Sequence, residues 1–399
     1  REWQKRRTQG NLFRVISLWL IISIFVLSFG SCASQSEITE FDEKATDNHV
    51  KIIDWETVNL YTPFSMGNFS PKLSLNCAKR LMEGYLVVEG SLYDEAIKFD
   101  AGQIDWDMQV TTSPNTFSLW LHTLNPLHYL TNAYVQSGDT QYIELAENIL
   151  NSWTRYNETS ETKNRYTWYD HTVAVRTENL IYYALTYKNL TGKTNEKVES
   201  EIKKHAEWLA EESNYVKNHN HGIFEDGALI KCGYYLKVQD YINIGIERLD
   251  KQLQYAYPNK AVHIENSTGY HIGLLTYLKQ LSSYLSTVND SFCSTINEYF
   301  TGALEFLVYA YEPNLNLPPI GDTFGADISS RELIKDYGNS LLRYISTKGK
   351  EGKKPDETTK LFKEDGYAFF RENWDSNSFE DSTWLMFKSG YNSTTHKHN

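Results

Sequence analysis

Cysteine is rare in this chain of 399 residues, which has only Cys32, Cys77, Cys232 and Cys293. No two of them are close in sequence, and an odd number is left beyond Cys32. Neither a disulfide framework nor a cysteine cage around a metal is therefore indicated. Apolar residues make up 41% of the chain, so it can bury a substantial core. We expect a fold held together by packing.

Proline is also scarce, with 9 residues in all, and β-branched residues rarely alternate with polar ones before residue 360. From about residue 60 to 345, apolar residues instead recur at helical spacing, and turns at Gly138 and Gly192 separate the runs. Two such runs are Tyr142, Ala146, Ile149, Trp153 and Val198, Ile202, Ala206, Leu209. Repeated helix pairs are typical of an α/α toroid or an α-solenoid. Because no sequence repeat of fixed period is evident, we predict an incomplete α/α toroid over residues 51–345.

Positive charge is in deficit, with 39 Lys and Arg against 51 Asp and Glu, which gives a net charge of -12. This balance argues against nucleic acid as a partner and offers a polyanion no long-range attraction. An anionic substrate would have to be captured by local groups in a cleft. Sulfate recognition calls for clustered Arg and Lys, whereas the pairs Lys203-Lys204 and Lys353-Lys354 are typical of solvated surfaces.

The first 32 residues indicate export. An apolar run over residues 15–29 follows Arg6, Arg7 and Arg14 and is succeeded by Gly-Ser-Cys at Cys32. A membrane-spanning helix needs about 20 residues, and small residues before a cysteine are typical of a bacterial lipoprotein signal peptide. We predict that residues 1–32 are this signal, that Cys32 carries the lipid anchor, and that residues 33–50 form a tether. The expected location is the periplasm, the outer membrane or the cell surface; an anchor helix or a plain secretory signal is the alternative.

The pattern changes after the helical region. Residues 346–365 are rich in Lys, Gly and Glu around Pro355, as surface linkers are. Residues 367–372 and 383–388 are short, aromatic and bounded by turn-forming residues, as strands are. Because two strands cannot build a core of their own, we predict that residues 366–399 begin a β domain of which this sequence holds only the start.

Four motifs, far apart in the sequence, carry amide, imidazole, phenol and carboxyl groups. The first opens a segment that is expected to be a helix entered from a loop, and the second precedes an apolar stretch at residues 272–285. The third is read as a structural loop whose last residue caps the next helix, and the fourth follows the predicted strands. The motifs are Asn220-His221, residues 265–271 with Tyr270, residues 317–322 ending in Asp322, and His396 with His398.

These groups suit the removal of a proton from C5 of a uronic acid sugar. The carboxylate next to C5 opposes this step, so it must be neutralised or hydrogen-bonded while a base acts at C5 and an acid acts at the leaving oxygen on C4. An amide such as that of Asn220 can donate to the carboxylate, and a histidine can share a proton near neutral pH. A tyrosine can abstract and return a proton when its neighbours lower its pKa. Backbone N–H groups at a helix start would face the same anion.

In their order and placement, the four motifs resemble those of the heparinase II/III-like polysaccharide lyases. The resemblance covers most of the chain beyond the tether and implies a helical toroid followed by an antiparallel β-sandwich. It also implies an enzyme that cleaves a uronic-acid-containing polysaccharide, a glycosaminoglycan or an alginate-like polymer, by β-elimination. Asn220 and His221 match the pair that neutralises the substrate carboxylate, and Tyr270 and His396 match catalytic residues.

The same resemblance suggests further site residues. Arg176 matches an arginine expected to hold substrate, and Glu225, four residues after His221, joins the substrate-binding candidates. Trp106 and Trp168 are candidates for stacking on sugar rings. His398 falls where several members of the family have a metal ligand, usually of a structural zinc ion in the second domain. Zinc takes about four ligands, and the remaining ones are not in this sequence.

Two other functions remain open. A glycoside hydrolase on an α/α toroid would need two carboxylates across a sugar, and a surface lipoprotein that binds glycans without catalysis would keep the aromatic residues. Thr123 stands where relatives often have an arginine, while His219 and His271 are expected to be structural. A mildly sulfated or unsulfated uronate polymer fits the scarce positive charge better than heparin does. The carboxylates available to a hydrolase are Asp170, Glu225, Asp226 and Asp322.

Overall fold

The computed structural model describes residues 71–88, 96–100, 103–161, 163–288, 290–321, 323 and 338–390. The predicted signal and tether, with Cys32, lie outside these residues, and so do Asp322, His396 and His398. The described part is mainly helical and ends in a three-stranded antiparallel sheet. None of the helices in these ranges is long and apolar enough to cross a membrane.

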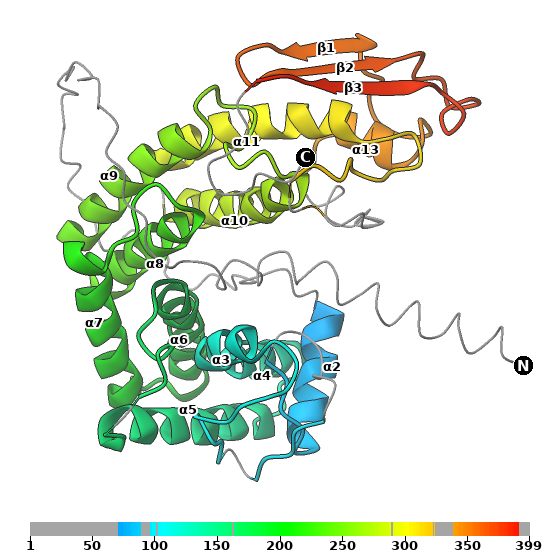
Figure 1. Cartoon of the computed structure of the whole chain (residues 1–399). Helices are drawn as coiled ribbons and strands as arrows, with labels where there is room; N and C mark the ends of the chain where they lie inside the picture. The colour runs from blue at the N-terminus through cyan, green and yellow to red at the C-terminus, as the bar shows by residue number, and fades with distance from the viewer. Residues whose placement is uncertain are drawn as a thin grey trace, which may run out of the picture.

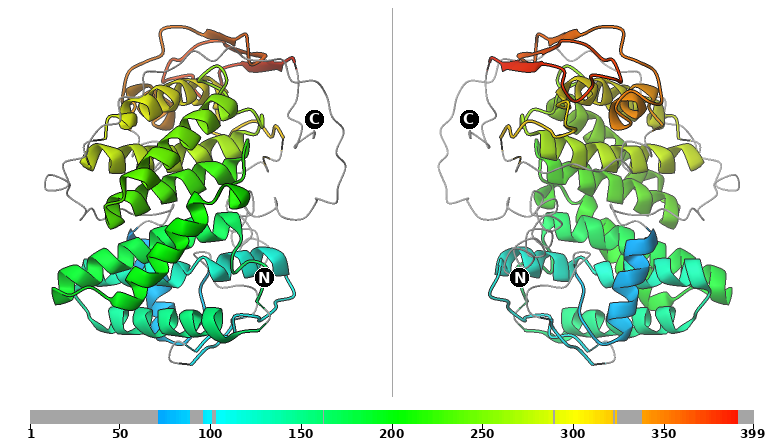
Figure 2. Two further views of the ribbon diagram at one scale, coloured as in Figure 1. Left: turned by 90° about the vertical axis from the view of Figure 1, so that its left-hand side faces the viewer. Right: turned by 90° about the vertical axis from the view of Figure 1, so that its right-hand side faces the viewer.

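The helices follow an open curve, as expected for an incomplete toroid (Figure 1). Both views in Figure 2 show them stacked from α2–α5 at one end to α10 and α11 at the other, where the sheet lies. The helices are α2 (Pro71–Met82), α3 (Pro114–His122), α4 (Asn125–Ser137), α5 (Gln141–Thr159), α6 (Asp170–Thr191), α7 (Glu196–Ala210), the 3-10 helix η2 (Glu212–Asn214), α8 (Asn220–Leu236), α9 (Gln239–Ala256), α10 (Thr268–Thr287), α11 (Phe292–Ala310) and α13 (Ser340–Ser346).

The predicted apolar stripes and turns are confirmed. All four apolar residues of the run in α5 are buried, and so are all four of the run in α7. Gly138 ends α4 and Gly192 ends α6, each with a left-handed backbone at φ 73° and 68°. Glycine adopts this conformation without a Cβ penalty, which is why it commonly follows the last helical turn.

The core has two large parts, and α8 belongs to both. Cys232 of α8 packs with residues of α2–α7 in the first part, whereas Ile230 packs with residues of α9–α11 and the sheet in the second. Most of α8 is buried. The helix that begins with Asn220 and His221 is therefore held from both sides, which fixes the position of its N-terminus.

The sheet has the order β1-β2-β3, with β1 (Thr359–Phe362), β2 (Tyr367–Arg371) and β3 (Trp384–Lys388). Its inner face packs on α11, where the ring of Phe306 contacts the rings of Phe362, Tyr367 and Phe369. The outer face exposes Leu361, Phe370, Leu385 and Phe387.

One boundary was predicted wrongly. Strand β1 lies inside residues 346–365, which the sequence assigned to a linker. The strand has only four residues, and a single one of them, Phe362, is buried. Such a short strand carries too little alternation to be recognised, and only its pairing with β2 makes it regular.

Candidate functional site

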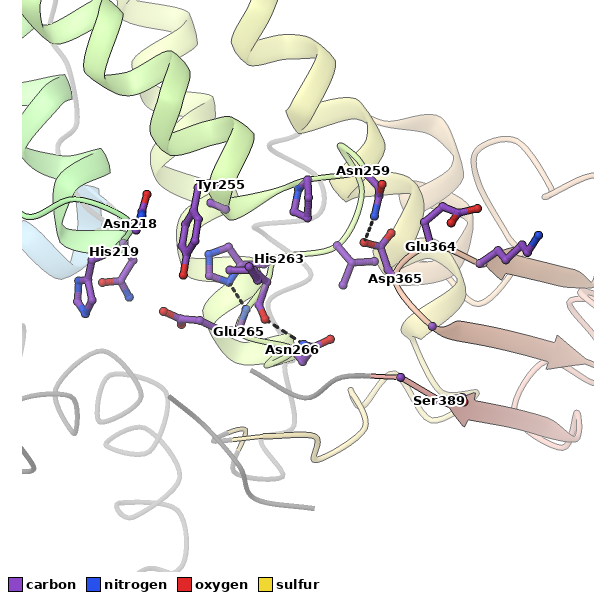
Figure 3. A pocket seen from close by; sticks show the side chains of 18 residues that line it. Asn218, His219, Tyr255, Asn259, His263, Glu265, Asn266, Glu364, Asp365 and Ser389 are labelled. Atoms are coloured by element: carbon purple, nitrogen blue, oxygen red, sulfur yellow. Dashed lines mark hydrogen bonds between the residues drawn. The ribbon is translucent and has the colours of Figure 1, made fainter. Parts of the chain in front are cut away.

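A pocket of about 350 Å³ lies where the helical region meets the sheet (Figure 3). One wall is the start of α8 with Asn220, and another is the connection from α9 to α10, which includes Glu265. The turn between β1 and β2 and the two residues after β3, Ser389 and Gly390, close the far side. Two of the sequence motifs therefore meet here, and the chain after β3 lines the pocket up to Gly390, which is six residues before His396 of the fourth motif.

The start of α8 is held by local hydrogen bonds. His219 is the N-cap, and its Nδ1 accepts a hydrogen bond from the backbone N–H of His221 at 3.1 Å. Gln252 of α9 accepts from the N–H of His219 at 3.3 Å and donates to the carbonyl of Val216 at 2.8 Å. A Cβ on Gly222 would lie 1.8 Å from Nε2 of Gln252 and 2.4 Å from the carbonyl oxygen of Val216. Glycine is therefore required after His221, because the chain before α8 passes so close.

Asp170, the first residue of α6, holds the ring of His221. Nδ1 of His221 lies 3.0 Å from Oδ1 of Asp170, which also accepts a hydrogen bond from the backbone N–H of His171. Burial acts to raise the pKa of Asp170, but the hydrogen bond and charge of His221 and the N–H of His171 outweigh it and lower that pKa. With Nδ1 bonded to a carboxylate, His221 has only Nε2 left for a ligand. The His171 ring stacks on it at 4.8 Å.

Glu225 and Asp226 lie in the same helix but not at the pocket. Glu225 is 1% exposed, and burial, together with the charge of Asp170, raises its pKa to about 8. Burial also raises the pKa of Asp226 well above its ordinary value, while its Oδ2 accepts a hydrogen bond from Tyr215 at 3.0 Å. We correct the assignment of Glu225 to substrate binding, because its carboxyl has almost no exposed surface.

The segment with Tyr270 forms the start of α10, and the predicted helix begins earlier than expected, at Thr268. Ser267 is the N-cap and accepts a hydrogen bond from the N–H of Tyr270 at 3.4 Å. Thr268 donates to the carbonyl of Pro318 at 3.0 Å, and Thr323 accepts from the N–H of Gly269 at 3.1 Å. Residues 317–321 and Thr323 thus fix this helix start, which agrees with the structural role predicted for that loop.

Tyr270 itself is 4% exposed and does not line the pocket, whereas Glu265 and Asn266 of the same motif do. Across the pocket, the hydroxyl of Tyr367 in β2 donates to Oδ1 of Asn266 at 3.1 Å, and Asn259 donates to Asp365 at 2.9 Å. These two bonds connect the sheet to the connection between α9 and α10, so the sheet is part of the site wall.

Arg176 belongs to the core, which corrects its assignment to substrate binding. It is 0% exposed, and its guanidinium donates to Nε2 of His205 at 2.7 Å and to the carbonyls of His122 and Thr167 at 2.7 and 2.8 Å. The rings of Trp153 and Trp168 lie 4.4 and 5.5 Å from it. Burial lowers its pKa to about 9. The guanidinium therefore joins α6 to its neighbours.

The two tryptophans also have structural positions. Trp106 is buried and its indole N–H donates to Ser152 at 3.2 Å. Trp168 is partly exposed, but its N–H donates to Asn157 at 3.0 Å and its ring packs on His205 at 4.9 Å. Neither residue lines the pocket. Their contacts give both residues structural roles, and stacking on sugar rings stays a prediction.

Sequence reasoning missed one residue of the pocket, Tyr255, and the role of another residue, Asp170. Tyr255, at the end of α9, is 37% exposed and stands between Asn218 and His263 in the pocket (Figure 3). Nothing in the sequence distinguishes it from the other tyrosines. Asp170 was noticed only as a possible hydrolase carboxylate, because its partner His221 is 51 residues away in the chain.

The predicted zinc site is not tested by these observations, since His398 lies outside the described residues. Within the ranges that are described, there is no group of three or more His, Cys, Asp and Glu side chains arranged to hold a metal ion. The zinc ion stays a prediction from the resemblance.

Two curated proteins are similar in sequence to most of this chain. The curated heparin-sulfate lyase of Bacteroides thetaiotaomicron is 23% identical over 307 residues, which are 70% of this chain and 43% of that protein. The heparin-sulfate lyase of Pedobacter heparinus is 21% identical over 304 residues, 70% of this chain and 45% of that protein. The chain therefore spans less than half the length of these relatives.

Solved structures agree in fold. A crystal structure of heparinase III matches with a TM-score of 0.66 at 21% identity, over 86% of this chain and 56% of that one. The heparan sulfate lyase of Pedobacter heparinus matches with a TM-score of 0.63 at 19% identity, over 87% and 55%. The family model described as Heparinase II/III N-terminus matches residues 77–348, more than half of the sequence. The chain belongs to the heparinase II/III N-terminal family.

Proposed function

We propose that this chain is the helical part of a polysaccharide lyase that cleaves a uronic-acid-containing polysaccharide by β-elimination. One observation carries the proposal. Asn220, the Glu265-Asn266 end of the tyrosine motif and Ser389-Gly390, which follow β3, meet at one pocket. These segments belong to motifs with the groups that elimination next to a carboxylate requires, and they lie up to 170 positions apart in the chain, from Asn220 to Gly390.

The start of α8 is suited to neutralising the substrate carboxylate. Asn220 lines the pocket, and its buried Oδ1 has no hydrogen-bond partner among the described residues. This oxygen is an acceptor; the donor for a substrate carboxylate is the NH2 group of the same amide, and the dipole at the start of a helix favours an anion. His221 is held through Nδ1 by Asp170 and offers Nε2 as the second group, although its side chain is nearly buried and does not line the pocket. Stabilising the charge that develops on the carboxylate is the main electrostatic task of such an enzyme.

The proton transfers fall to Tyr270 and His396. A base removes the C5 proton, the electron pair forms the C4–C5 double bond, and the C4 oxygen leaves with a proton from an acid. A phenol that takes the first proton can return it to the leaving oxygen. Because Tyr270 is nearly buried, the proposal requires its hydroxyl to become accessible when substrate binds.

The proposed substrate class is a glycosaminoglycan-type or alginate-like uronate polymer. The relation to heparin-sulfate lyases supports this class, and so does the concentration of hydrogen-bonding groups in the pocket. For the alternative of a hydrolase, Glu225 and Asp226 are buried and do not line the pocket, whereas Glu265, Glu364 and Asp365 do.

The test is a panel of uronate polysaccharides incubated with the purified protein, with ultraviolet absorbance of the new C4–C5 double bond as the readout. We expect absorbance to rise with at least one polymer, and Asn220→Ala to lower that rate by about 10²–10³, the usual effect of losing one charge-stabilising donor. New reducing ends without absorbance would indicate a hydrolase. Binding without cleavage would indicate a glycan-binding protein.

We also propose that the protein is exported and anchored to a membrane through a lipid on Cys32. This proposal rests on the apolar run over residues 15–29 and the small residues before the cysteine.

A further inference from the structure

A second pocket of about 500 Å³ lies beside the first and shares Asn218 with it. The connection between α7 and α8 forms one side, and α9 forms the other. Ile244, Arg248 and Lys251 of α9 line this second pocket, and Tyr255 lines the first. Their spacing of four, three and four residues places them on one face of the helix. That face extends about 16 Å at 1.5 Å per residue, so one stripe of α9 runs from pocket to pocket.

The two pockets differ in charge. The first has the carboxylates of Glu265, Glu364 and Asp365 and a single lysine, Lys363. The second has three cationic side chains and two carboxylates. Positive charge that could attract an acidic polymer is thus concentrated in the second pocket and not in the first. The charged residues of the second pocket are Lys217, Arg248, Lys251, Glu212 and Glu247.

The three cations are held differently. Arg248 is fixed, because it donates to the carbonyls of Leu209 and Ala210 at 2.7 and 2.9 Å and lies over the ring of Tyr215 at 4.3 Å. It also pairs with Glu212 at 2.8 Å. Its guanidinium therefore keeps a fixed position in the wall of the pocket.

The two lysines can exchange partners. Lys217 pairs with Glu212 at 2.6 Å and Lys251 with Glu247 at 2.8 Å, but their side chains are 68% and 71% exposed. Exposed pairs of this kind contribute little to stability. An anionic ligand can therefore compete with either glutamate for its lysine at small cost.

We infer that the second pocket is a subsite for an acidic sugar unit of the same polymer whose reacting unit occupies the first pocket. The inference rests on the proposed function for the identity of the polymer. Asn218 borders both pockets, and the stripe of α9 links them, so a chain that leaves the first pocket past Tyr255 reaches Lys251 and Lys217 next. The subsite supplies the positive charge that the first pocket lacks, and it favours long substrates over short ones.

The test compares oligosaccharide length. Binding is measured by calorimetry in a Tyr270→Phe background, which keeps the substrate intact, with tetrasaccharides and dodecasaccharides of heparan sulfate, chondroitin sulfate, hyaluronan and alginate. The sulfated and unsulfated members show which anionic group the subsite takes. We expect a dodecasaccharide to bind at least about tenfold more tightly than its tetrasaccharide, as a linked second contact permits.

Combining Lys217→Ala with Lys251→Ala should remove most of this advantage, weaken its salt dependence, and leave tetrasaccharide binding within about twofold. Lys353→Ala is the matched control, because Lys353 is equally exposed and ion-paired, with Asp356, but lines neither pocket. An unchanged length advantage in the double variant overturns the subsite, and so does a background protein that binds none of the dodecasaccharides. Unsaturated product from the background protein would contradict the role of Tyr270 and not the subsite.

Discussion

At the scale of single residues, burial decides which groups of this molecule are chemically available. The pKa of Asp170 is lowered by its partner His221. The pKa of Glu225, one helical turn after His221, is raised to about 8. The two carboxyls lie in one electrostatic environment, since the charge of Asp170 contributes to the raised pKa of Glu225. Asp170 therefore stays ionised to orient His221, and Glu225 stays protonated near neutral pH.

This difference predicts how stability depends on pH. The folded-state pKa of Glu225 is about 8, raised from an ordinary value of 4.5. The unfolded chain releases this proton above about pH 4.5 whereas the folded chain keeps it, so the free energy of unfolding falls as pH rises from about 4.5 to about 8. Glu225→Gln replaces the ionisable carboxyl with a neutral amide. The stability of this variant relative to the wild type should therefore be higher at pH 8 than at pH 5. Melting temperatures of both proteins at the two pH values test this, and equal pH dependence would contradict it.

Tyr270→Phe separates chemistry from binding. The phenol contributes a proton to the proposed mechanism, whereas its ring, which phenylalanine retains, contributes packing. We expect kcat to fall by orders of magnitude with little change in KM, as for an interaction made mainly in the transition state. Single-turnover kinetics on the best substrate measures this. A rate within about threefold of the wild type, well under 1 kcal/mol of barrier, would mean that another group is the base.

The residue assignments that failed also follow from burial. Arg176 satisfies backbone carbonyls in the core, yet an arginine in an apolar helix looks the same in sequence as one that holds a substrate. The cation cluster of the second pocket was overlooked because Lys217 lies before α8 while Arg248 and Lys251 lie in α9. Only residues that neighbour each other in sequence were visible as clusters.

At the scale of elements, helices could be predicted and the short strand could not. The stripes of α5 and α7 repeat over several turns, and the start of α8 at Asn220 follows from its sequence. Strand β1 depends on its partner for regularity. The convergence of α8, the connection from α9 to α10 and the sheet at one pocket depends on packing between distant segments, which periodicity does not encode.

The close approach at the start of α8 gives a prediction for this element. Gly222→Ala would place a Cβ against Gln252 and the carbonyl of Val216. We expect a loss of about 1–3 kcal/mol of stability, typical of overpacking, and a lower turnover because His221 moves with the backbone. Gly233→Ala at the other end of α8 is the control, since its Cβ would lie 2.5 Å from Ile242. Denaturant unfolding and rate assays of both variants test this. Equal turnover in the two would show that the start of α8 does not position catalytic groups.

At the scale of the whole molecule, the described chain joins a helical array to a sheet through one aromatic contact surface. Phe306 of α11 packs on both β1 and β2, and the second part of the core includes residues of both regions. The pocket lies at this junction. The sheet is therefore part of the same folded unit as α8–α11, and loss of the sheet should disturb the site.

Export gives a prediction for the whole protein. Cys32→Ala should leave the protein without a lipid and release it from the membrane fraction, because the lipid is the proposed anchor. Fractionation of cells that express each form, followed by immunodetection, measures the distribution. A variant that stays tightly bound to membranes would show that residues 15–29 are themselves the anchor.

The central claim is that the pocket at the start of α8 supports elimination, in which no water enters the products. The most direct measurement is cleavage of the best polymer in water labelled with heavy oxygen, followed by mass spectrometry of the products. Elimination predicts fragments whose masses sum to that of the parent chain, without labelled oxygen at the cleaved bond, and one new end that has lost a proton and a C–O bond. Incorporation of one labelled oxygen per cleavage would contradict the claim and assign the chain to hydrolysis.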